Sequence, residues 1–380
     1  MLQVVFWASL VGAFYSYFVY PVVLLLLPGR GPAGSGVPAA SSWPRLSLII
    51  TVHNESSRIA EKLRNSLAVN YPPGLLEVIV ASDCSSDATD EIVRSFSGSG
   101  VKLVRSDEHR GKEYAQWLAI QAAQGEILVF SDAATQIPPD SLLRIAERFA
   151  DPTLGALSSE DRFISDDGSI VGEGAYVKYE MWLRSLESRH AGLVGLSGSF
   201  FAARKSICVP WDTASPSDFN TALNCSRHGF RSISGGDVLG YYKDIKDPRR
   251  EYQRKVRTVV RGVTAIARQS EVLNPFRYGF FAFQVWSHKI MRWVVPWCLL
   301  VAFLANVGLA DDHWFYAATL CAQVVVYGLT ALAAWPFPGL RRVMPLRLVY
   351  FFLQANIAVM HASLAYMAGR RVVVWSPSQR

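Results

Sequence analysis

The segment Leu46-Ser47-Leu48-Ile49-Ile50-Thr51-Val52 decides the fold that the sequence predicts. It is short, follows Pro44, and consists almost entirely of β-branched and aliphatic residues. Such an uninterrupted apolar run is typical of a strand buried on both faces, as in a parallel sheet. The polar cluster His53-Asn54-Glu55-Ser56-Ser57 comes next and can leave the strand and begin a helix.

Two further apolar runs, at 75–81 and 127–130, also end in polar residues. The first leads into Ser82-Asp83-Cys84-Ser85-Ser86-Asp87-Ala88-Thr89, and the second into Ser131-Asp132-Ala133-Ala134-Thr135. Ligands of open α/β sheets bind at the carboxyl ends of the strands, so we expect these polar segments to share one site. Strands and helices alternate from Leu46 to about Arg204, which predicts a parallel sheet covered by helices.

The apolar residues outside this region are concentrated at the two ends of the chain. Hydrophobic residues make up 51% of the sequence, and the mean hydropathy is +0.18. The run Val4–Leu27 is long enough to cross a bilayer and lacks the features of a cleaved signal peptide, so it predicts a retained anchor. Three more such runs, with Trp and Tyr near their ends, lie at Trp293–Leu309, Trp314–Trp335 and Leu346–Met367.

Loop charges indicate how these segments are oriented. Arg30 predicts that the region after the first segment is cytoplasmic, at the inner (plasma) membrane of the cell. The acidic Asp311-Asp312 loop then lies outside and the basic Arg341-Arg342 loop inside. The basic tail at 369–380 breaks this pattern, because three further crossings place it outside. Either one run is re-entrant or the last is an interfacial pair, and both alternatives stay open.

Charge and cysteine content exclude other classes. The net charge is +7, but the basic residues cluster near apolar tracts, where they face membrane lipids, so we expect no nucleic-acid partner. The five cysteines show no paired-ligand spacing, which predicts reduced thiols and neither a zinc site nor a disulfide framework. They are Cys84, Cys208, Cys225, Cys298 and Cys321.

Three motifs together resemble the nucleotide-sugar half of a family 2 glycosyltransferase: 51–55, 81–89 and 131–134. More narrowly, they resemble the membrane-bound bacterial members related to cellulose, chitin and hyaluronan synthases. The resemblance implies an α/β GT-A domain with transmembrane and interfacial helices. It also implies inverting transfer of a sugar from a nucleotide-diphosphate donor, UDP-linked or similar, to a lipid-linked or polysaccharide acceptor in cell-surface polysaccharide biosynthesis. The predicted regions are a transmembrane helix at 1–28, a linker at 29–45, a cytoplasmic GT-A domain at 46–270, interfacial helices at 271–292, a transmembrane region at 293–368 and a tail at 369–380.

The resemblance assigns several residues to the donor. Asp83 would bind uracil or ribose, although it could merely cap the helix that begins near Asp87. Glu55, in the same motif as Thr51, would contact the nucleotide or act as a capping-box partner. Lys112 resembles a Gly-Lys motif that touches the donor, and the alternative is a solvated lysine at a helix start.

Asp132 is the predicted ligand of Mg2+ or Mn2+, because a divalent cation prefers carboxylate oxygens and can bridge two phosphates. The family pattern carries Asp-x-Asp here, whereas this chain has Asp132-Ala133-Ala134. Either Asp132 binds the metal together with water and phosphate, or metal dependence is reduced.

Asp218 is the predicted general base, because it falls where the family's Glu-Asp or Asp-Asp motif would stand. The alternative is an N-cap on a helix that begins at Asn220. Downstream, the family's polymerising members carry Gln-x-x-Arg-Trp. Only the arginine matches clearly, so Arg257 with Arg254 is predicted to neutralise the diphosphate, and processive polymerisation is in doubt.

Two other classes of protein compete with this interpretation. A dinucleotide-dependent membrane oxidoreductase needs a glycine-rich turn after the first strand, and 51–57 contains no glycine. A non-catalytic nucleotide-binding scaffold subunit of a polysaccharide secretion complex is consistent with Ala134 and with the altered Arg254 motif.

Overall fold

A computed structural model describes residues 1–29, 43–164, 175–243, 248–334, 337, 339 and 343–371, which fall into two compact units. The helical unit comprises Met1–Leu26, Asp247–Val263 and Phe283–Arg371, and the sheet unit consists mainly of Leu27–Lys246 and Thr264–Ala282. Most of the predicted linker, the Arg341-Arg342 loop and most of the predicted tail lie outside the described residues.

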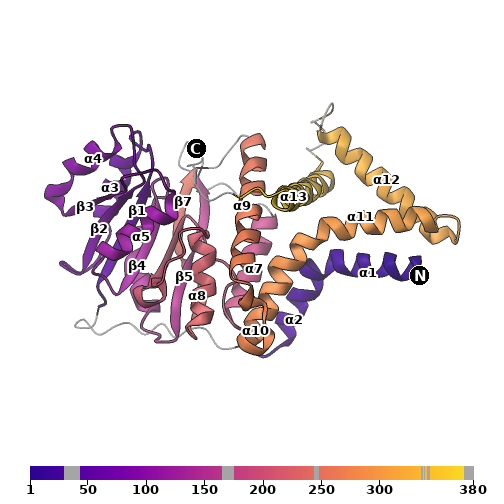
Figure 1. Ribbon diagram of the computed structural model, residues 1–380, viewed down its shortest axis with the longest axis horizontal. Coiled ribbons are helices and arrows are strands. Elements are labelled where there is room, and N and C mark those ends of the chain that lie inside the picture. Colours follow the sequence, from indigo (N-terminus) through magenta and orange to yellow (C-terminus); the bar gives the residue numbers. More distant parts are fainter. Residues whose placement is uncertain are drawn as a thin grey trace. The chain divides into compact units, whose positions relative to one another are not determined.

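The sheet unit is built on a seven-stranded mixed sheet with the strand order β3-β2-β1-β4-β6-β5-β7 (Figure 1). Strands β1 to β4 are parallel, as predicted, but β6 runs antiparallel to both β4 and β5. The α/β fold class is therefore confirmed, and the expectation of a purely parallel sheet is corrected. The strands are β1 Leu46–Val52, β2 Leu76–Ser82, β3 Val101–Arg105, β4 Ile127–Asp132, β5 Leu154–Ile164, β6 Phe200–Arg204 and β7 Arg231–Lys243.

Amphipathic helices cover both faces of this sheet. Leu48 and Ile50 of β1 pack on one face with Ile59 and Leu63 of α3, and Ile49 packs on the opposite face with helix α5. This alternation explains why the whole of β1 is buried and why its sequence is uniformly apolar. The helices are α3 Ile59–Leu67, α4 Thr89–Ser95, α5 Lys112–Ala122, α6 Ser141–Arg148, α7 Ala175–Ser188 and α8 Ser217–Arg227, with 3-10 turns at Ser97–Ser99, Lys205–Cys208 and Ser270–Leu273.

The strand order places a topological switch point at the carboxyl end of β1. The chain proceeds from β1 to β2 on one side and β4 pairs with β1 on the other, so the direction of winding switches between β1 and β4. Thr51 of β1 is in register with Ala81 of β2 and Asp132 of β4. Ligands of open α/β sheets bind at such a switch point.

The helical unit contains most of the long apolar helices. Four helical segments, Leu2–Leu26, Pro275–Leu309, Trp314–Ala334 and Met344–Met367, are long and apolar enough to cross a membrane. Many of their large side chains are exposed, among them Val324 and Ile357, as expected for surfaces that face lipid. The elements are α1 Leu2–Phe14, a π turn at Tyr15–Val19, α2 Tyr20–Leu26, α9 Pro248–Arg268 and α10 Pro275–Val285 (both shared with the sheet unit), a π turn at Trp286–Ile290, α11 Met291–Leu309, α12 Trp314–Ala334 and α13 Met344–Met367.

Two local predictions are corrected in the second half of the sheet, and one strand there was not predicted. The strand expected from Leu196 begins only at Phe200, so Gly198 lies in the segment before β6. The helix expected from Asn220 begins at Ser217, which places Asp218 in its first turn. Strand β7 was not predicted, because Gly235-Gly236 interrupts its apolar pattern.

Candidate active site

Asp83 lies at the end of β2, where its carboxylate binds the loop that leads into α5. The side chain is fully buried, and its two oxygens accept hydrogen bonds from the backbone N–H groups of Arg110 (2.9 Å) and Gly111 (2.8 Å). Gly111 has φ 101°, a conformation that favours glycine. Asp83 therefore does more than cap a local helix, because it fixes the start of α5.

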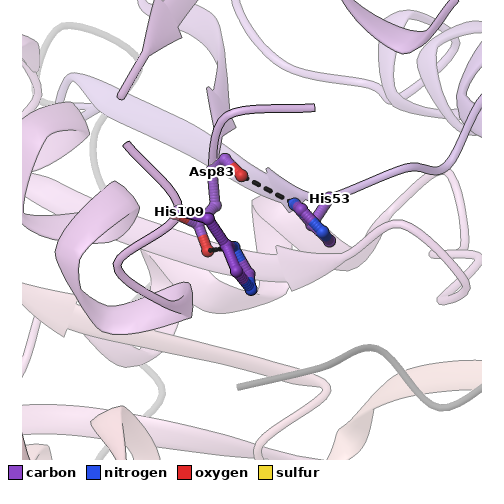
Figure 2. Close-up of side chains that lie close together, drawn as sticks. All are labelled: His53, Asp83 and His109. Atoms are coloured by element: carbon purple, nitrogen blue, oxygen red, sulfur yellow. Dashed lines mark hydrogen bonds and ion pairs between the residues drawn. The ribbon is translucent and has the colours of Figure 1, made fainter. Parts of the chain in front are cut away.

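Two histidines flank Asp83, as Figure 2 shows. His109 Nδ1 lies 2.8 Å from the Asp83 carboxylate, and His53 Nδ1 lies 2.6 Å from the Asp83 backbone oxygen. The two imidazole rings stack with their centroids 4.1 Å apart. One ligand atom from each of the three residues lies within 4.8 Å of the others, so this group can hold a metal ion. The stacked rings also form a flat surface beside the carboxylate.

The turns that follow β1 and β2 are held together by polar contacts. Asn54 and Cys84 both have φ 53°, which non-glycine residues adopt only where the surroundings stabilise it. The Asn54 side-chain oxygen accepts a hydrogen bond from the Ser86 N–H at 2.8 Å. The Glu55 N–H donates to Thr89 Oγ1 at 2.8 Å. The turn after β1 and the turn after β2, which carry two of the predicted nucleotide motifs, are therefore hydrogen-bonded to each other.

Two of the predicted donor residues in β1 and its turn are buried. The Glu55 side chain lies 3.3 Å from Arg58, so its carboxylate is part of an ion pair at the start of α3. Thr51 is 2% exposed, and its hydroxyl has no hydrogen-bond partner among the described residues.

Lys112 connects the donor end of the site to the segment before β6. Its ammonium donates to Asp132 Oδ1 at 2.6 Å and to the Gly198 carbonyl at 2.9 Å. The Lys112 side chain is 8% exposed, so this contact is shielded from solvent and is not that of a solvated lysine. The Asp132 N–H donates to the Ser199 carbonyl at 2.9 Å, which joins the same two segments a second time.

Asp218 lies next to Gly198. A methyl carbon added at Gly198 would come within 3.2 Å of Asp218 Oδ2, and the Leu196 N–H donates to the Asp218 carbonyl at 3.2 Å. Pro216 occupies the N-cap position of α8, so Asp218 is not the cap that the alternative interpretation proposed. Within the described part of the chain, no hydrogen-bond donor contacts the Asp218 carboxylate, which leaves it open to accept a proton.

Asp161 is a site residue that the sequence did not reveal. Its carboxylate accepts hydrogen bonds from the hydroxyls of Ser197 (2.7 Å), Ser199 (2.6 Å) and Ser159 (3.3 Å). Two of these serines flank Gly198, so Asp161 anchors the segment that contacts Lys112 and Asp218. The only signal for Asp161 in the sequence is its position in β5, which begins with apolar residues and continues with polar ones.

The surroundings of Asp132 fit a divalent cation bound through one carboxylate oxygen. Oδ1 is paired with Lys112, and Oδ2 has no donor among the residues that the structure describes. The side chain is 23% exposed, so the second oxygen can be reached. Ala134 provides no second carboxylate, and water or phosphate would have to supply the other ligands.

Arg254 and Arg257 lie on α9, in the helical unit. Burial lowers the pKa of Arg257, and the nearby Arg261 and Arg254 guanidinium groups lower it further. The charges of the three arginines therefore lie close enough to repel one another. The assignment of Arg254 and Arg257 to the diphosphate stays a prediction that rests on the motif.

The sequence profile of Glycosyl transferase family 2 matches residues 47–208, the segment from β1 through β6 that carries Asp83, Lys112 and Asp132. These residues form a family 2 glycosyltransferase domain. The resemblance inferred from the three motifs is confirmed for this segment, and the chain also has helices suited to membrane integration.

Curated relatives are similar to part of this chain, and a solved structure shares its fold. Poly-beta-1,6-N-acetyl-D-glucosamine synthase of Staphylococcus epidermidis is 31% identical over 177 residues, which are 44% of this chain and 42% of that protein. The protein of the same name from Staphylococcus aureus strain COL is 31% identical over 176 residues, with the same coverage. The match thus spans less than half of these relatives. A mannosyltransferase from Pyrobaculum calidifontis, in complex with GDP-Man and Mn2+, has a similar fold, with a TM-score of 0.74, 23% identity, and coverage of 98% of this chain and 100% of that one.

Proposed function

We propose that this protein is an integral-membrane, inverting glycosyltransferase that moves a sugar from a nucleotide diphosphate to a lipid-linked or polysaccharide acceptor. One observation carries the proposal: a continuous series of contacts links the three predicted acidic residues. Asp83 holds the loop before Lys112, and Lys112 binds Asp132 and the carbonyl of Gly198. Gly198 in turn packs against Asp218.

The donor nucleotide binds across the carboxyl ends of β1, β2 and β4. The stacked rings of His53 and His109 face the nucleobase or ribose, and the buried Asp83 carboxylate holds His109 in place. Thr51 lies at the end of β1, and Glu55 lies in the turn that follows. The diphosphate lies towards Lys112, whose buried ammonium stabilises negative charge better than a solvated one would. A UDP-linked sugar is the proposed donor.

Asp218 acts as the general base. Its carboxylate accepts the proton of the acceptor hydroxyl while the hydroxyl oxygen attacks the anomeric carbon. The bond from that carbon to the phosphate oxygen breaks in the same step, and the nucleoside diphosphate leaves. Attack from the side opposite the leaving group inverts the configuration.

Asp132 is the proposed ligand of Mg2+ or Mn2+ through its second oxygen. A divalent cation supplies Lewis-acid stabilisation of the diphosphate when it is bound. Lys112 orients the Asp132 carboxylate through its contact with Oδ1, and the other carboxylate oxygen then faces the cation.

A membrane-associated acceptor is supported by the four apolar helices and by the named activity of the relatives. We propose that the sheet unit is cytoplasmic at the inner (plasma) membrane, because the donor is a cytosolic metabolite class and basic residues follow the first apolar helix. The products contribute to cell-surface polysaccharide.

The test is release of nucleoside diphosphate by detergent-purified protein from a panel of nucleotide sugars, with membrane extract as the acceptor source. Release that depends on one donor and stops in Asp218→Asn supports the proposal. A non-catalytic scaffold predicts no release from any donor, and this result would reject the enzymatic assignment. Asp140→Asn serves as the control, because that carboxylate binds Arg144 at the start of α6.

A further inference from the structure

A buried lysine contacts both sides of the turn that carries Asp132. Lys62, on α3, is 2% exposed. Its ammonium donates to the hydroxyl of Ser131 at 2.7 Å and to the carbonyl of Thr135 at 2.5 Å. These two residues precede and follow Asp132-Ala133-Ala134, so the lysine closes the turn from the α3 side.

The charge of Lys62 is coupled to that of Asp132. Burial lowers the pKa of Lys62 to about 7, and attraction by the Asp132 carboxylate acts in the opposite direction. Lys112, from α5, contacts the same carboxylate at 2.6 Å. Asp132 therefore interacts with two lysines that approach from helices on opposite faces of the sheet.

A pocket of about 200 Å³ opens at the same turn. Lys62, Ala133 and Ala134 line it together with Arg58, Glu61 and Gln136. Glu61 is an exposed carboxylate that accepts a hydrogen bond from Gln136. The turn at 132–135 contributes a single carboxylate, that of Asp132. The buried ammonium group of Lys62 binds the residues on either side of the Asp132-Ala133-Ala134 segment.

We propose that Lys62 is a built-in positive charge of the donor site, which prevents Asp132 from holding a divalent cation until a nucleoside diphosphate is bound. This inference rests on the proposed function, because it assumes that the diphosphate lies beside Asp132. Lys62 acts through Asp132 and is a positioning residue.

The reasoning is electrostatic. One carboxylate flanked by two ammonium groups carries a net positive charge, which repels a divalent cation across a few ångströms of protein. A diphosphate adds negative charge and oxygen ligands, so the cation and the nucleotide favour each other's binding to the same extent. The cation then enters and leaves with the nucleotide, which allows the product diphosphate to be released.

The experiment measures Mn2+ binding by electron paramagnetic resonance, with and without UDP, at about pH 6, where a lysine whose pKa is about 7 is mostly protonated. It compares the wild type with Lys62→Met, which keeps the side-chain length, with Ala134→Asp, which adds a carboxylate, and with Lys102→Met as a control. Lys102 is an exposed lysine of β3 that contacts the Ala122 carbonyl.

The wild type is expected to bind Mn2+ at least about tenfold more tightly with UDP than without it. Without UDP, Lys62→Met and Ala134→Asp should each tighten Mn2+ binding by about tenfold or more, and Lys102→Met should have no effect. A lysine with a merely structural role predicts the opposite sign, because its loss would loosen the turn and weaken Mn2+ binding.

Equal Mn2+ affinity of the wild type with and without UDP would overturn the inference, and so would unchanged or weaker binding in Lys62→Met. If Lys62→Met does not fold, Lys62→Gln, which removes the charge but keeps a hydrogen-bond donor, takes its place, and unchanged or weaker Mn2+ binding in that variant would overturn the inference. Failure of the proposed function looks different, because no nucleoside diphosphate would then bind with or without Mn2+.

Discussion

The two halves of the candidate site hold their carboxylates differently. At the ends of β2 and β4, Asp83 receives two backbone N–H groups and Asp132 an ammonium group. At the start of α8, no donor from the described residues reaches the Asp218 carboxylate, although Gly198 packs against it. The half that would bind the donor is preorganised by hydrogen bonds, and the half that would accept a proton is left open. This contrast is what an enzyme that grips one substrate and deprotonates the other requires.

The largest effect should come from the open half. Asp218→Asn removes the proton acceptor while keeping the shape of the side chain. Transfer should fall by about 10²–10⁴-fold, the usual contribution of a general base, while the affinity for UDP stays unchanged. Steady-state transfer and UDP titration of the same preparation would measure both quantities. A variant that transfers normally would show that the open carboxylate is not the base.

Asp83→Asn should have the next largest effect, and it should lower the affinity for UDP and not the rate of proton transfer. The amide would point its own N–H towards the N–H groups of Arg110 or Gly111, so the loop before α5 loses charge-assisted hydrogen bonds worth about 1.5–3 kcal/mol each. UDP affinity should fall by about ten- to a hundredfold. Unchanged affinity in calorimetry would mean that the preorganised half is not where the nucleotide binds.

Asp161→Asn tests the segment that joins the two halves. The amide can accept fewer hydrogen bonds from Ser197 and Ser199, so the position of Gly198 becomes less well defined. We expect kcat to fall by about tenfold, with little change in the KM for the donor, because the contacts of Asp83 are untouched. Ser159→Ala is the comparison variant, because it removes the 3.3 Å contact with Asp161 and the 2.7 Å hydrogen bond to the Phe200 carbonyl but leaves the contacts of Asp161 with Ser197 and Ser199. An effect confined to the donor KM would place Asp161 in the binding half instead.

The last prediction concerns stability and not catalysis. The pKa of Lys62 is about 7 in the folded protein, below its ordinary value of 10.5, so the unfolded chain binds the proton more tightly between these values. Folding stability should therefore rise with pH across this window, by at most about 1.4 kcal/mol per pH unit from this group. Lys62→Met should flatten the profile, as thermal unfolding in detergent at several pH values would measure. Identical profiles for the two proteins would show that the lysine is not buried as described.

The fold around the candidate donor residues could be predicted from the sequence, because Asp83 and Asp132 stand at the ends of apolar strands. Observed β1 matches the expected Leu46–Val52, and Asp83 and Asp132 lie where the first parallel strands end. Local pattern is sufficient there, because parallel strands bring their carboxyl ends to one edge.

The second half was harder to predict because its contacts join distant residues. Asp161 binds hydroxyls 36 and 38 positions away, and the antiparallel β6 has no signature that distinguishes it from a parallel strand. The burial of Lys62 could have been predicted from the sequence. It lies between Ile59, Leu63 and Ser66 on the buried face of α3, where a lysine needs a partner.

The most direct test of the account is UDP binding to four proteins: the wild type, Asp83→Asn, Asp132→Asn and Asp218→Asn. If the acidic residues act on one nucleotide sugar, the first two variants should bind UDP more weakly than the wild type, and Asp218→Asn should bind it equally well but fail to transfer sugar. Wild-type affinity in both strand-end variants, or loss of UDP binding in Asp218→Asn alone, would contradict the central claim.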